Sequence, residues 1–266
     1  MSQNTKIDWA DDSINFDEGC DETSNPGCKE CYAIHRLLPM RGIMPGTVRR
    51  TSETNWQKPL IWQRRLEQTG EVRFVFGNSM GDFFHRKTDD HRSEIWDIIR
   101  RTPNLNWIIL TQRPSNILSR LPADWDAGYP NVWLGISASD QMHTDKRVPT
   151  LLRVPSALHF ISLEPLVAPV ALRDNWLHGE GNKLKWVITG GMSGKNWERY
   201  PLFPSWVRTL RDQCQFAQVS FFFKQLGGPA NNYRDGDQAL LDGKLYKEVP
   251  TSTANPIRRD SQLSLL

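Results

Sequence analysis

The sequence has no long apolar segment, few cysteines and almost no net charge. None of its hydrophobic runs approaches the ~18 residues that span a bilayer, and its first twelve residues are polar and acidic, unlike a signal peptide. The 33 Lys+Arg and 30 Asp+Glu give a formal charge of +3, which excludes a histone-like polycation and an acidic tail. We therefore expect a cytoplasmic protein without a membrane partner.

Apolar residues are plentiful enough for a sizeable core. The 266 residues include 11 Trp and 11 Phe, and 38% are hydrophobic. Short apolar, β-branched or aromatic runs predict buried strands at 72–77, 107–110, 132–136, 158–163, 186–189 and 219–223. Helical spacing predicts helices at 93–101, 114–121, 146–152 and 204–215.

Strands that alternate with helices, and that are apolar on both faces, indicate an α/β protein with a mainly parallel sheet. The regular spacing favours a partial (β/α) barrel over residues 1–230, although an open doubly wound sheet would show the same alternation of strands and helices. Phe221-Phe222-Phe223 has an alternative as an edge strand. Residues 231–266 are expected to form a polar extension with turns at Asp235-Gly236 and Asp242-Gly243 and a mobile end.

Polar residues follow the predicted strands, where ligands gather in parallel α/β proteins. Such residues are also ordinary turn and cap residues. A turn or cap role explains Asp82, Arg113 and Glu164 less well, because a charged side chain directly after a buried strand needs a partner. The Gly190-Gly191 pair allows a close backbone approach but lacks the ending of a phosphate loop. The other candidates at strand ends are Ser79, Ser137 and Lys224.

The cysteine pattern is the most specific signal. Cys20, Cys28 and Cys31 lie within twelve residues, a cluster more typical of metal binding than of disulfides, while Cys214 on a predicted helix is expected to be buried. His35 would complete a Cys3His zinc site. Three cysteines would instead leave one iron of a [4Fe-4S] cluster open for a small ligand. Reduced cysteines without metal are the third alternative.

Several ordered blocks resemble one family. The chain resembles the phage-associated three-cysteine proteins of the gp-thirty-seven/gp-sixty-eight type over roughly residues 6–228. The blocks are Asp8-Trp9, Asn15, Gly19-Cys20, Gly27-Cys28-Lys29-Glu30-Cys31-Tyr32-Ala33, Ser79-Met80-Gly81-Asp82-Phe83-Phe84-His85, Leu110-Thr111-Gln112-Arg113-Pro114, Asn131-Val132-Trp133-Leu134-Gly135-Ile136-Ser137, Phe160-Ile161-Ser162-Leu163-Glu164-Pro165-Leu166, Val187-Ile188-Thr189-Gly190-Gly191-Met192-Ser193-Gly194 and Phe222-Phe223-Lys224-Gln225.

This family in turn resembles radical S-adenosylmethionine enzymes, which implies a partial (β/α) barrel, a [4Fe-4S] cluster and S-adenosyl-L-methionine as cofactors. The implied cluster ligands are Cys20, Cys28 and Cys31. The implied S-adenosylmethionine or substrate contacts are Ser79, Asp82, Ser137, Gly190 and Gly191. The implied catalytic residues are Glu164, Arg113 and Lys224. The chain departs in two ways from the usual cysteine motif of these enzymes, Cys-x3-Cys-x2-Cys with an aromatic residue before the third cysteine. Seven residues separate its first two cysteines, and its aromatic residue, Tyr32, follows the third cysteine.

The phage association implies a DNA substrate, a cytoplasmic location in the host cell, and an enzyme of thymidine hypermodification that isomerises a glycinylthymidine from its nitrogen-linked to its carbon-linked form. A reductant such as flavodoxin or ferredoxin is the implied electron donor. Phosphate contacts and stacking are predicted for basic and tryptophan residues that otherwise form a solvated helix face: Arg49, Arg50, Arg64, Arg65, Arg100, Arg101, Trp56 and Trp62. A zinc-stabilised nucleic-acid-binding module, or a radical enzyme acting on RNA or a small metabolite, remain alternatives.

Overall fold

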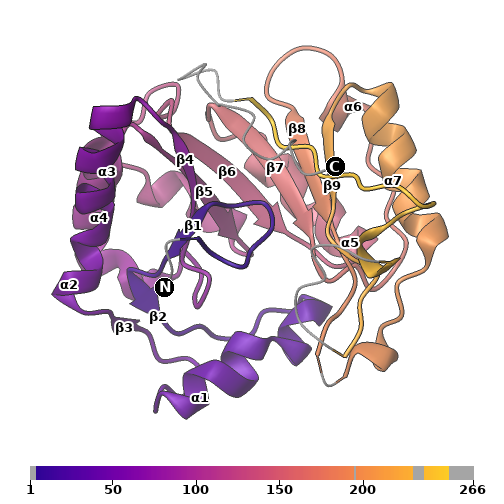
Figure 1. Cartoon of the computed structure of the whole chain (residues 1–266), viewed down its shortest axis with the longest axis horizontal. Helices are drawn as coiled ribbons and strands as arrows, with labels where there is room; N and C mark the ends of the chain where they lie inside the picture. Colours follow the sequence, from indigo (N-terminus) through magenta and orange to yellow (C-terminus); the bar gives the residue numbers. More distant parts are fainter. Residues whose placement is uncertain (1–3, 195, 230–236, 252–266) are drawn as a thin grey trace.

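The computed structural model describes residues 4–194, 196–229 and 237–251. Its centre is a 7-stranded sheet with the spatial order β1-β4-β5-β6-β7-β8-β9 and parallel neighbours throughout. Because the spatial order follows the chain order without a reversal, the sheet has no doubly wound switch point and curls in one direction (Figure 1). The strands are β1 (Asp12–Ile14), β4 (Arg73–Gly77), β5 (Leu105–Thr111), β6 (Val132–Ser137), β7 (Leu158–Leu163), β8 (Leu184–Thr189) and β9 (Ser220–Phe223).

Helices lie on the outside of the curled sheet (Figure 1). A small antiparallel pair, β2 with β3, precedes α2 and α3, whereas only short 3-10 turns link β5 to β6. The elements are β2 (Asp17–Glu18), β3 (Arg49–Arg50), α1 (Leu38–Met40), α2 (Glu53–Trp56), α3 (Lys58–Thr69), α4 (Arg92–Arg100), α5 (Gln141–Leu151), α6 (Asp174–Leu177) and α7 (Pro204–Phe216). Among the described residues, none of these helices has both the length and the apolar character needed to cross a membrane.

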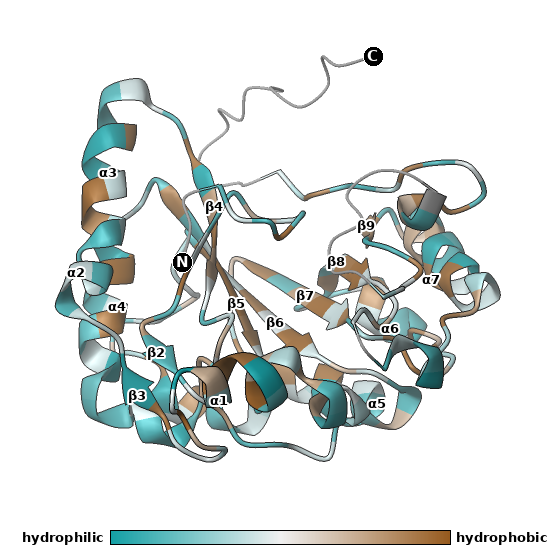
Figure 2. Cartoon of the chain, turned by 60° about the horizontal axis from the view of Figure 1, so that its bottom comes forward, coloured by the Kyte–Doolittle hydropathy of each residue, from teal (hydrophilic) through white to brown (hydrophobic). Residues whose placement is uncertain are grey.

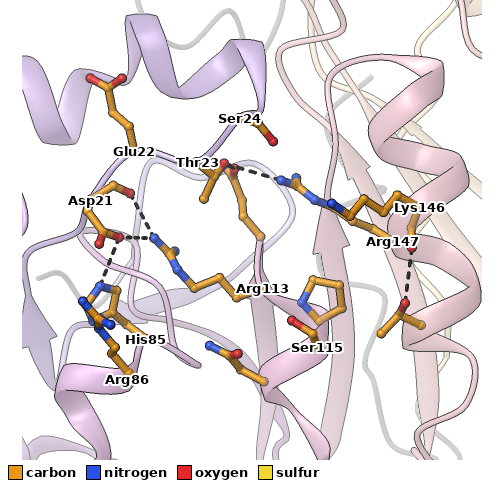
Figure 3. Close-up of a pocket in the computed structure, with 14 residues that line it drawn as sticks. Asp21, Glu22, Thr23, Ser24, His85, Arg86, Arg113, Ser115, Lys146 and Arg147 are labelled. Carbon is orange, nitrogen blue, oxygen red and sulfur yellow. Dashed lines mark hydrogen bonds and ion pairs between the residues drawn. The ribbon is translucent and has the colours of Figure 1, made fainter.

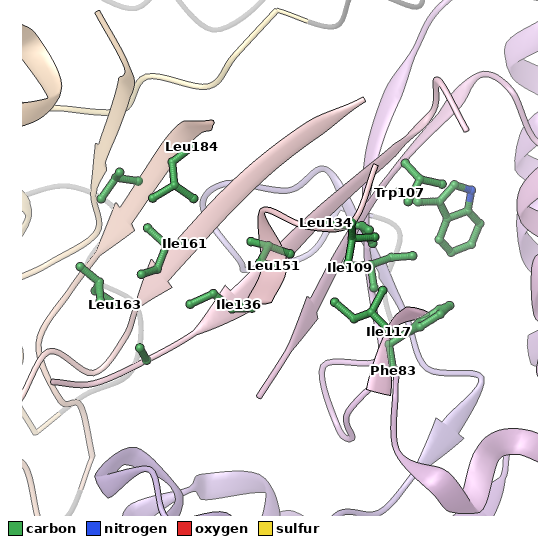
Figure 4. Packing of buried hydrophobic residues seen from close by; sticks show 14 of the residues in the cluster. Phe83, Trp107, Ile109, Ile117, Leu134, Ile136, Leu151, Ile161, Leu163 and Leu184 are labelled. Carbon is green, nitrogen blue, oxygen red and sulfur yellow. The ribbon is translucent and has the colours of Figure 1, made fainter. Parts of the chain in front are cut away.

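Successive strand residues point to opposite faces of the sheet, and both faces are covered by apolar side chains. The strand sequences are therefore continuous hydrophobic runs. One layer packs against the helices, as Ile136 and Leu134 do near Leu151 of α5 (Figure 4). The other layer is built from large aromatic side chains and includes Trp9 from the chain's start. Its buried members are Trp9, Phe74, Ile108, Trp133, Leu158, Phe160, Trp186, Ile188 and Phe222. Hydrophobic residues accordingly concentrate on the strands in Figure 2.

The predicted strands match β4 to β9 closely, and 219–223 is both a parallel strand and the sheet's edge. Two helix predictions need correction. Residues 114–121 form the 3-10 turns Pro114–Asn116 and Leu118–Arg120, and α5 begins at Gln141, earlier than predicted, because Asp140 accepts a hydrogen bond from His143 N and caps its start.

Part of the predicted C-terminal extension packs on the barrel. Lys247 forms an antiparallel bridge with Phe222 of β9, and Phe223 N donates to Tyr246 O at 2.8 Å. Asp242 and Gly243 both have positive φ and form the predicted tight turn. The Asp235-Gly236 turn and the last dozen residues lie outside the described part of the chain.

His159 on β7 gives the fold a dependence on pH. Burial lowers the pKa of this imidazole to about 4, although its hydrogen bond with Val154 O acts in the opposite direction. The unfolded chain therefore binds more protons between pH ~6.5 and ~4, and folding stability falls as the pH drops through that window. From pH 7.5 to 5 we expect a loss of about 2 kcal/mol at this site.

Urea unfolding of wild type and His159→Gln at several pH values measures this contribution. Glutamine does not titrate, so the variant's stability should fall less steeply below pH 6.5. Parallel stability curves for the two proteins would refute the assignment of this pH dependence to His159.

Candidate active site

The cysteine loop lies against the ends of several strands. Gly19 bridges to Gly81, after β4, and Asn25 Nδ2 donates to Ser139 Oγ, after β6, at 3.1 Å. Gly27 packs so closely that a Cβ there would lie 2.8 Å from Ser139 Oγ and 2.9 Å from Pro165 Cδ, after β7. The residues between Cys20 and Cys28 thus hold the loop at the carboxyl edge of the sheet.

The three thiols are buried or half-buried. Burial raises the pKa of Cys20 to about 12, with a further contribution from Asp82 and an opposing one from Arg113. Burial also raises the pKa of Cys31. A negative charge on Cys28 would raise the pKa of Cys20 and of Cys31 further. Any metal centre must displace thiol protons here.

The donor set fits an iron–sulfur cluster. Within the described part of the chain, no group of three His, Cys, Asp or Glu side chains is arranged to hold a metal ion. Three cysteine thiolates are nevertheless the type of donor that iron–sulfur clusters use. His35, the predicted fourth zinc ligand, has Nε2 3.1 Å from Cys28 O and 3.3 Å from Glu22 Oε1. The imidazole therefore stabilises the loop backbone, and three thiols remain as the donor set.

Asp82 joins two strand ends and positions Arg113. Its carboxylate accepts from Thr111 Oγ1 at 2.6 Å, Gln112 N at 2.9 Å and Arg113 Nη1 at 2.9 Å. Phe84 N donates a fourth bond at 3.0 Å. This buried carboxylate is thus saturated by the chain's own donors, and its predicted contact with S-adenosylmethionine or substrate stays a prediction.

Arg113 lies between the carboxylates and a sulfur. Its Nη1 is 3.8 Å from Cys20 Sγ, and its Nη2 pairs with Asp21. Burial alone would lower the pKa of Arg113, but Asp82, Cys20 and Asp21 outweigh it and raise that pKa. The guanidinium is therefore a fixed cation beside a predicted cluster ligand.

A second buried guanidinium belongs to Arg147 of α5, which is 5% exposed and donates to Ser137 O. Arg147 and Arg113 line a cavity of about 520 Å³ (Figure 3). The cavity lies between residues 21–24 of the cysteine loop, His85 and Arg86 in the segment after β4, the end of β5, and α5. Lys146 and Arg86 also line it, whereas Glu164 and Lys224 do not.

Glu164 and Lys224 form an ion pair at the ends of β7 and β9. Glu164 Oε1 lies 3.3 Å from Lys224 Nζ, and Glu164 Oε2 accepts from Ser162 Oγ at 3.3 Å and Trp9 Nε1 at 3.4 Å. Burial would lower the pKa of Lys224, but Glu164 outweighs it, so the net shift is upward. Lys247 Nζ donates to Lys224 O at 3.0 Å. Two charged groups are thus held together at the sheet's edge.

The remaining predicted contacts have structural partners within the chain. A Cβ on Gly191 would lie 2.0 Å from Leu226 O, and one on Gly190 would lie 3.1 Å from Glu164 Oε1. Ser79 Oγ lies 3.3 Å from the Asn15 side chain. Ser137, at the end of β6, is buried. Their predicted roles toward S-adenosylmethionine stay predictions.

The prediction of base stacking on the outer helices is wrong for the two tryptophans, whereas the phosphate contacts predicted for the arginines stay predictions. Trp56 and Trp62 are buried, so neither can stack on a base. Arg50 pairs with Glu94 at 2.8 Å, and Arg100 and Arg101 each pair with Asp97 at 3.3 Å. The inward-packed tryptophans match the alternative of a solvated helix face.

Some site residues escaped prediction because their contacts span the chain. Trp9 reaches Glu164 across 155 residues, and Lys247 comes from the predicted extension. Arg147 was missed because nothing in the sequence distinguishes it from an arginine on the exposed face of a helix. Cys214 matches its prediction and is 0% exposed on α7.

Gly27→Ala should weaken metal binding, because the added methyl group collides with Ser139 and Pro165 and displaces the loop. We expect a several-fold lower iron content after anaerobic reconstitution and a loss of about 1–3 kcal/mol in stability. Gly181→Ala is the control, since a Cβ at this positive-φ residue meets no atom within 4 Å. Equal iron content in the two variants would contradict the role of Gly27.

Comparisons with known proteins place the chain in a family. Residues 4–250 match the family described as protein of unknown function, DUF5131, so the chain belongs to it. No curated protein matches the chain.

Solved structures of spore photoproduct lyase are similar to the chain. A tyrosine-to-phenylalanine mutant has a TM-score of 0.51 at 12% identity, over 80% of this chain and 76% of that one. A double mutant with bound AdoMet and dinucleoside spore photoproduct has a TM-score of 0.45 at 12% identity. That match covers 82% of this chain, which spans only 56% of the double mutant's length. The predicted fold, a partial (β/α) barrel of the radical S-adenosylmethionine type, is confirmed.

Proposed function

We propose that the protein is a radical S-adenosylmethionine enzyme that modifies a thymine base in phage DNA, with a [4Fe-4S] cluster held by Cys20, Cys28 and Cys31. The observation that carries the proposal is the set of three thiols on one loop at the carboxyl edge of a half-barrel. The fold shared with spore photoproduct lyase supports it. When bound, the cluster and S-adenosylmethionine supply a 5′-deoxyadenosyl radical that removes hydrogen from an unactivated carbon.

The most specific form of the proposal is the isomerisation of 5-Nα-glycinylthymidine to 5-Cα-glycinylthymidine. The bond between the thymine methylene and the glycine nitrogen breaks, and a bond from that methylene to the glycine α-carbon forms. A hydrogen leaves the α-carbon and the nitrogen gains one, so substrate and product have the same composition and oxidation level. Acid–base groups alone activate this α-carbon poorly, which favours a radical enzyme.

The Glu164–Lys224 pair fits the glycine part of this substrate. A glycinyl group carries an amine and a carboxylate, and the pair offers a carboxylate and an ammonium whose charged atoms are 3.3 Å apart. Both side chains are more than three-quarters buried, which strengthens their interaction with a charged ligand. In this role Glu164 binds the substrate amine, Lys224 binds its carboxylate, and Ser162 and Trp9 orient Glu164.

The charges near the cysteines have a second role in the proposal. Arg113 and Arg147 place two buried cations beside the sulfurs, which favours the anionic, thiolate-bound state of the loop. Asp82 and Asp21 hold Arg113 in that position. A flavodoxin- or ferredoxin-type donor supplies the electron in this proposal.

Product analysis tests the function. DNA that contains 5-Nα-glycinylthymidine is incubated anaerobically with reconstituted enzyme, dithionite and S-adenosylmethionine, and then digested to nucleosides. The proposal predicts a nucleoside of unchanged mass and different chromatographic retention. Formation of 5′-deoxyadenosine only with RNA or a small metabolite would reassign the substrate, and a colourless protein that retains zinc would favour the nucleic-acid-binding alternative.

A further inference from the structure

The segment after the cysteine loop exposes two methionines. Met40, at the end of α1, is 76% exposed and Met44 is 67% exposed, although Ile43 between them is buried. Figure 1 shows α1 at the periphery, away from the helices that cover the sheet. We call residues 38–46 the methionine loop. Its two exposed methionine side chains lie outside the packed core.

The methionine loop is anchored at the candidate active site. Leu38 and Ile43 pack in one cluster with Met80, the third residue after β4. Gly46 N donates to Cys20 O at 2.9 Å, so a backbone hydrogen bond joins the loop to the residue predicted as a cluster ligand. Lys87 Nζ donates to Gly46 O at 2.5 Å. The loop's position relative to the cysteines is therefore fixed.

Arginines flank these methionines in the sequence. Arg41 and Arg49 both pair with Glu18, whose side chain is only 6% exposed, so two guanidiniums share one carboxylate. Arg36 is exposed on the preceding turn. The surface thus combines exposed, flexible apolar tips with an excess of arginine. Proteins that pry bases apart in duplex DNA combine the same two features, an apolar wedge and phosphate-binding cations.

We infer that the methionine loop is a duplex-DNA wedge: Met40 and Met44 insert between base pairs beside the target thymine, and Arg36, Arg41 and Arg49 hold the flanking phosphates. The inference rests on the proposed DNA substrate and adds how the base leaves the duplex. A thymine stacked in a duplex cannot reach the strand ends of a half-barrel, so it must be turned out. A wedge tied to Cys20 opens the stack at a fixed distance from the cysteines.

The test uses the full-length protein and a 20-base-pair unmodified duplex with 2-aminopurine next to a thymine. Wild type should bind and raise the 2-aminopurine fluorescence as the base unstacks. The double variant Met40→Ala/Met44→Ala should bind about 10-fold more weakly and lose most of the fluorescence change. Met142→Ala on α5 is the matched control, because Met142 is also 67% exposed. It should behave like wild type.

A salt titration tests the arginines separately. Arg49→Gln should reduce the slope of log affinity against log salt by about 1. Unchanged fluorescence and affinity in the double methionine variant would overturn the wedge, as would methionine-dependent binding to phosphatidylserine vesicles without an effect on DNA. If wild type does not bind duplex DNA, the inference also fails, whereas conversion of 5-Nα-glycinylthymidine within single-stranded DNA would leave the proposed function standing.

Discussion

Replacement of Cys28 by alanine should abolish iron binding and the formation of 5′-deoxyadenosine. Cys28 is the buried member of the three thiols on the loop, and its loss removes one of the three proposed ligands. Two remaining thiols cannot hold a four-iron cluster in the proposed three-cysteine mode. We expect iron and sulfide near background after reconstitution, and 5′-deoxyadenosine reduced at least ~1,000-fold, because the radical chemistry depends on the cluster.

Cys214→Ala is the matched control for this experiment. Cys214 is also a free, buried cysteine, but it lies on α7 and contacts the apolar core. Its removal should cost about 1–2 kcal/mol of stability through a small cavity and leave the iron content unchanged. Iron loss in both variants would point to general unfolding, and full iron in Cys28→Ala would remove Cys28 from the ligand set.

Glu164→Gln should separate radical formation from substrate turnover. The variant keeps the size of the side chain but removes the carboxylate that holds Lys224 in its charged form. We expect product formation to fall at least ~100-fold, since a buried charge that contacts the substrate contributes on this scale. Iron content and the 5′-deoxyadenosine formed without turnover should stay near wild type, because Glu164 is not one of the proposed cluster ligands and does not line the cavity beside residues 21–24.

The stability effect of Glu164→Gln follows from the same pair. Removing one partner of a buried ion pair costs 3–5 kcal/mol, but both side chains here keep some solvent contact, so about 1–3 kcal/mol is expected. Asp242→Asn, which breaks the exposed contacts to Arg208 and Arg211 on α7, is the control and should not change product formation. Normal turnover by Glu164→Gln would refute its proposed contact with the substrate.

The sheet was largely predictable because its strands are buried on both faces. Runs such as 158–163 contain enough apolar residues in succession to mark a strand without knowledge of its neighbours, and β7 has the predicted bounds. β1 was not predictable in this way, since Asp12 and Ser13 make up most of its length and its pairing with β4 depends on the fold. α3 was also missed, because its polar residues outnumber Trp62 and Leu66 on its buried side.

The candidate site was predictable only in its separate parts. The spacing of Cys20, Cys28 and Cys31 indicates a shared centre because a short loop keeps them together. The polar residues after each strand meet because parallel strands end at one edge. The pairing of Glu164 with Lys224 and Trp9 required the folded chain, since each contact joins residues far apart in sequence.

Anaerobic reconstitution followed by dithionite and S-adenosylmethionine tests the central claim most directly. The purified protein should take up iron and sulfide in equal amounts, become brown and release 5′-deoxyadenosine only when both dithionite and S-adenosylmethionine are present. A colourless protein that binds one zinc per chain, takes up no iron and releases no 5′-deoxyadenosine would contradict the account.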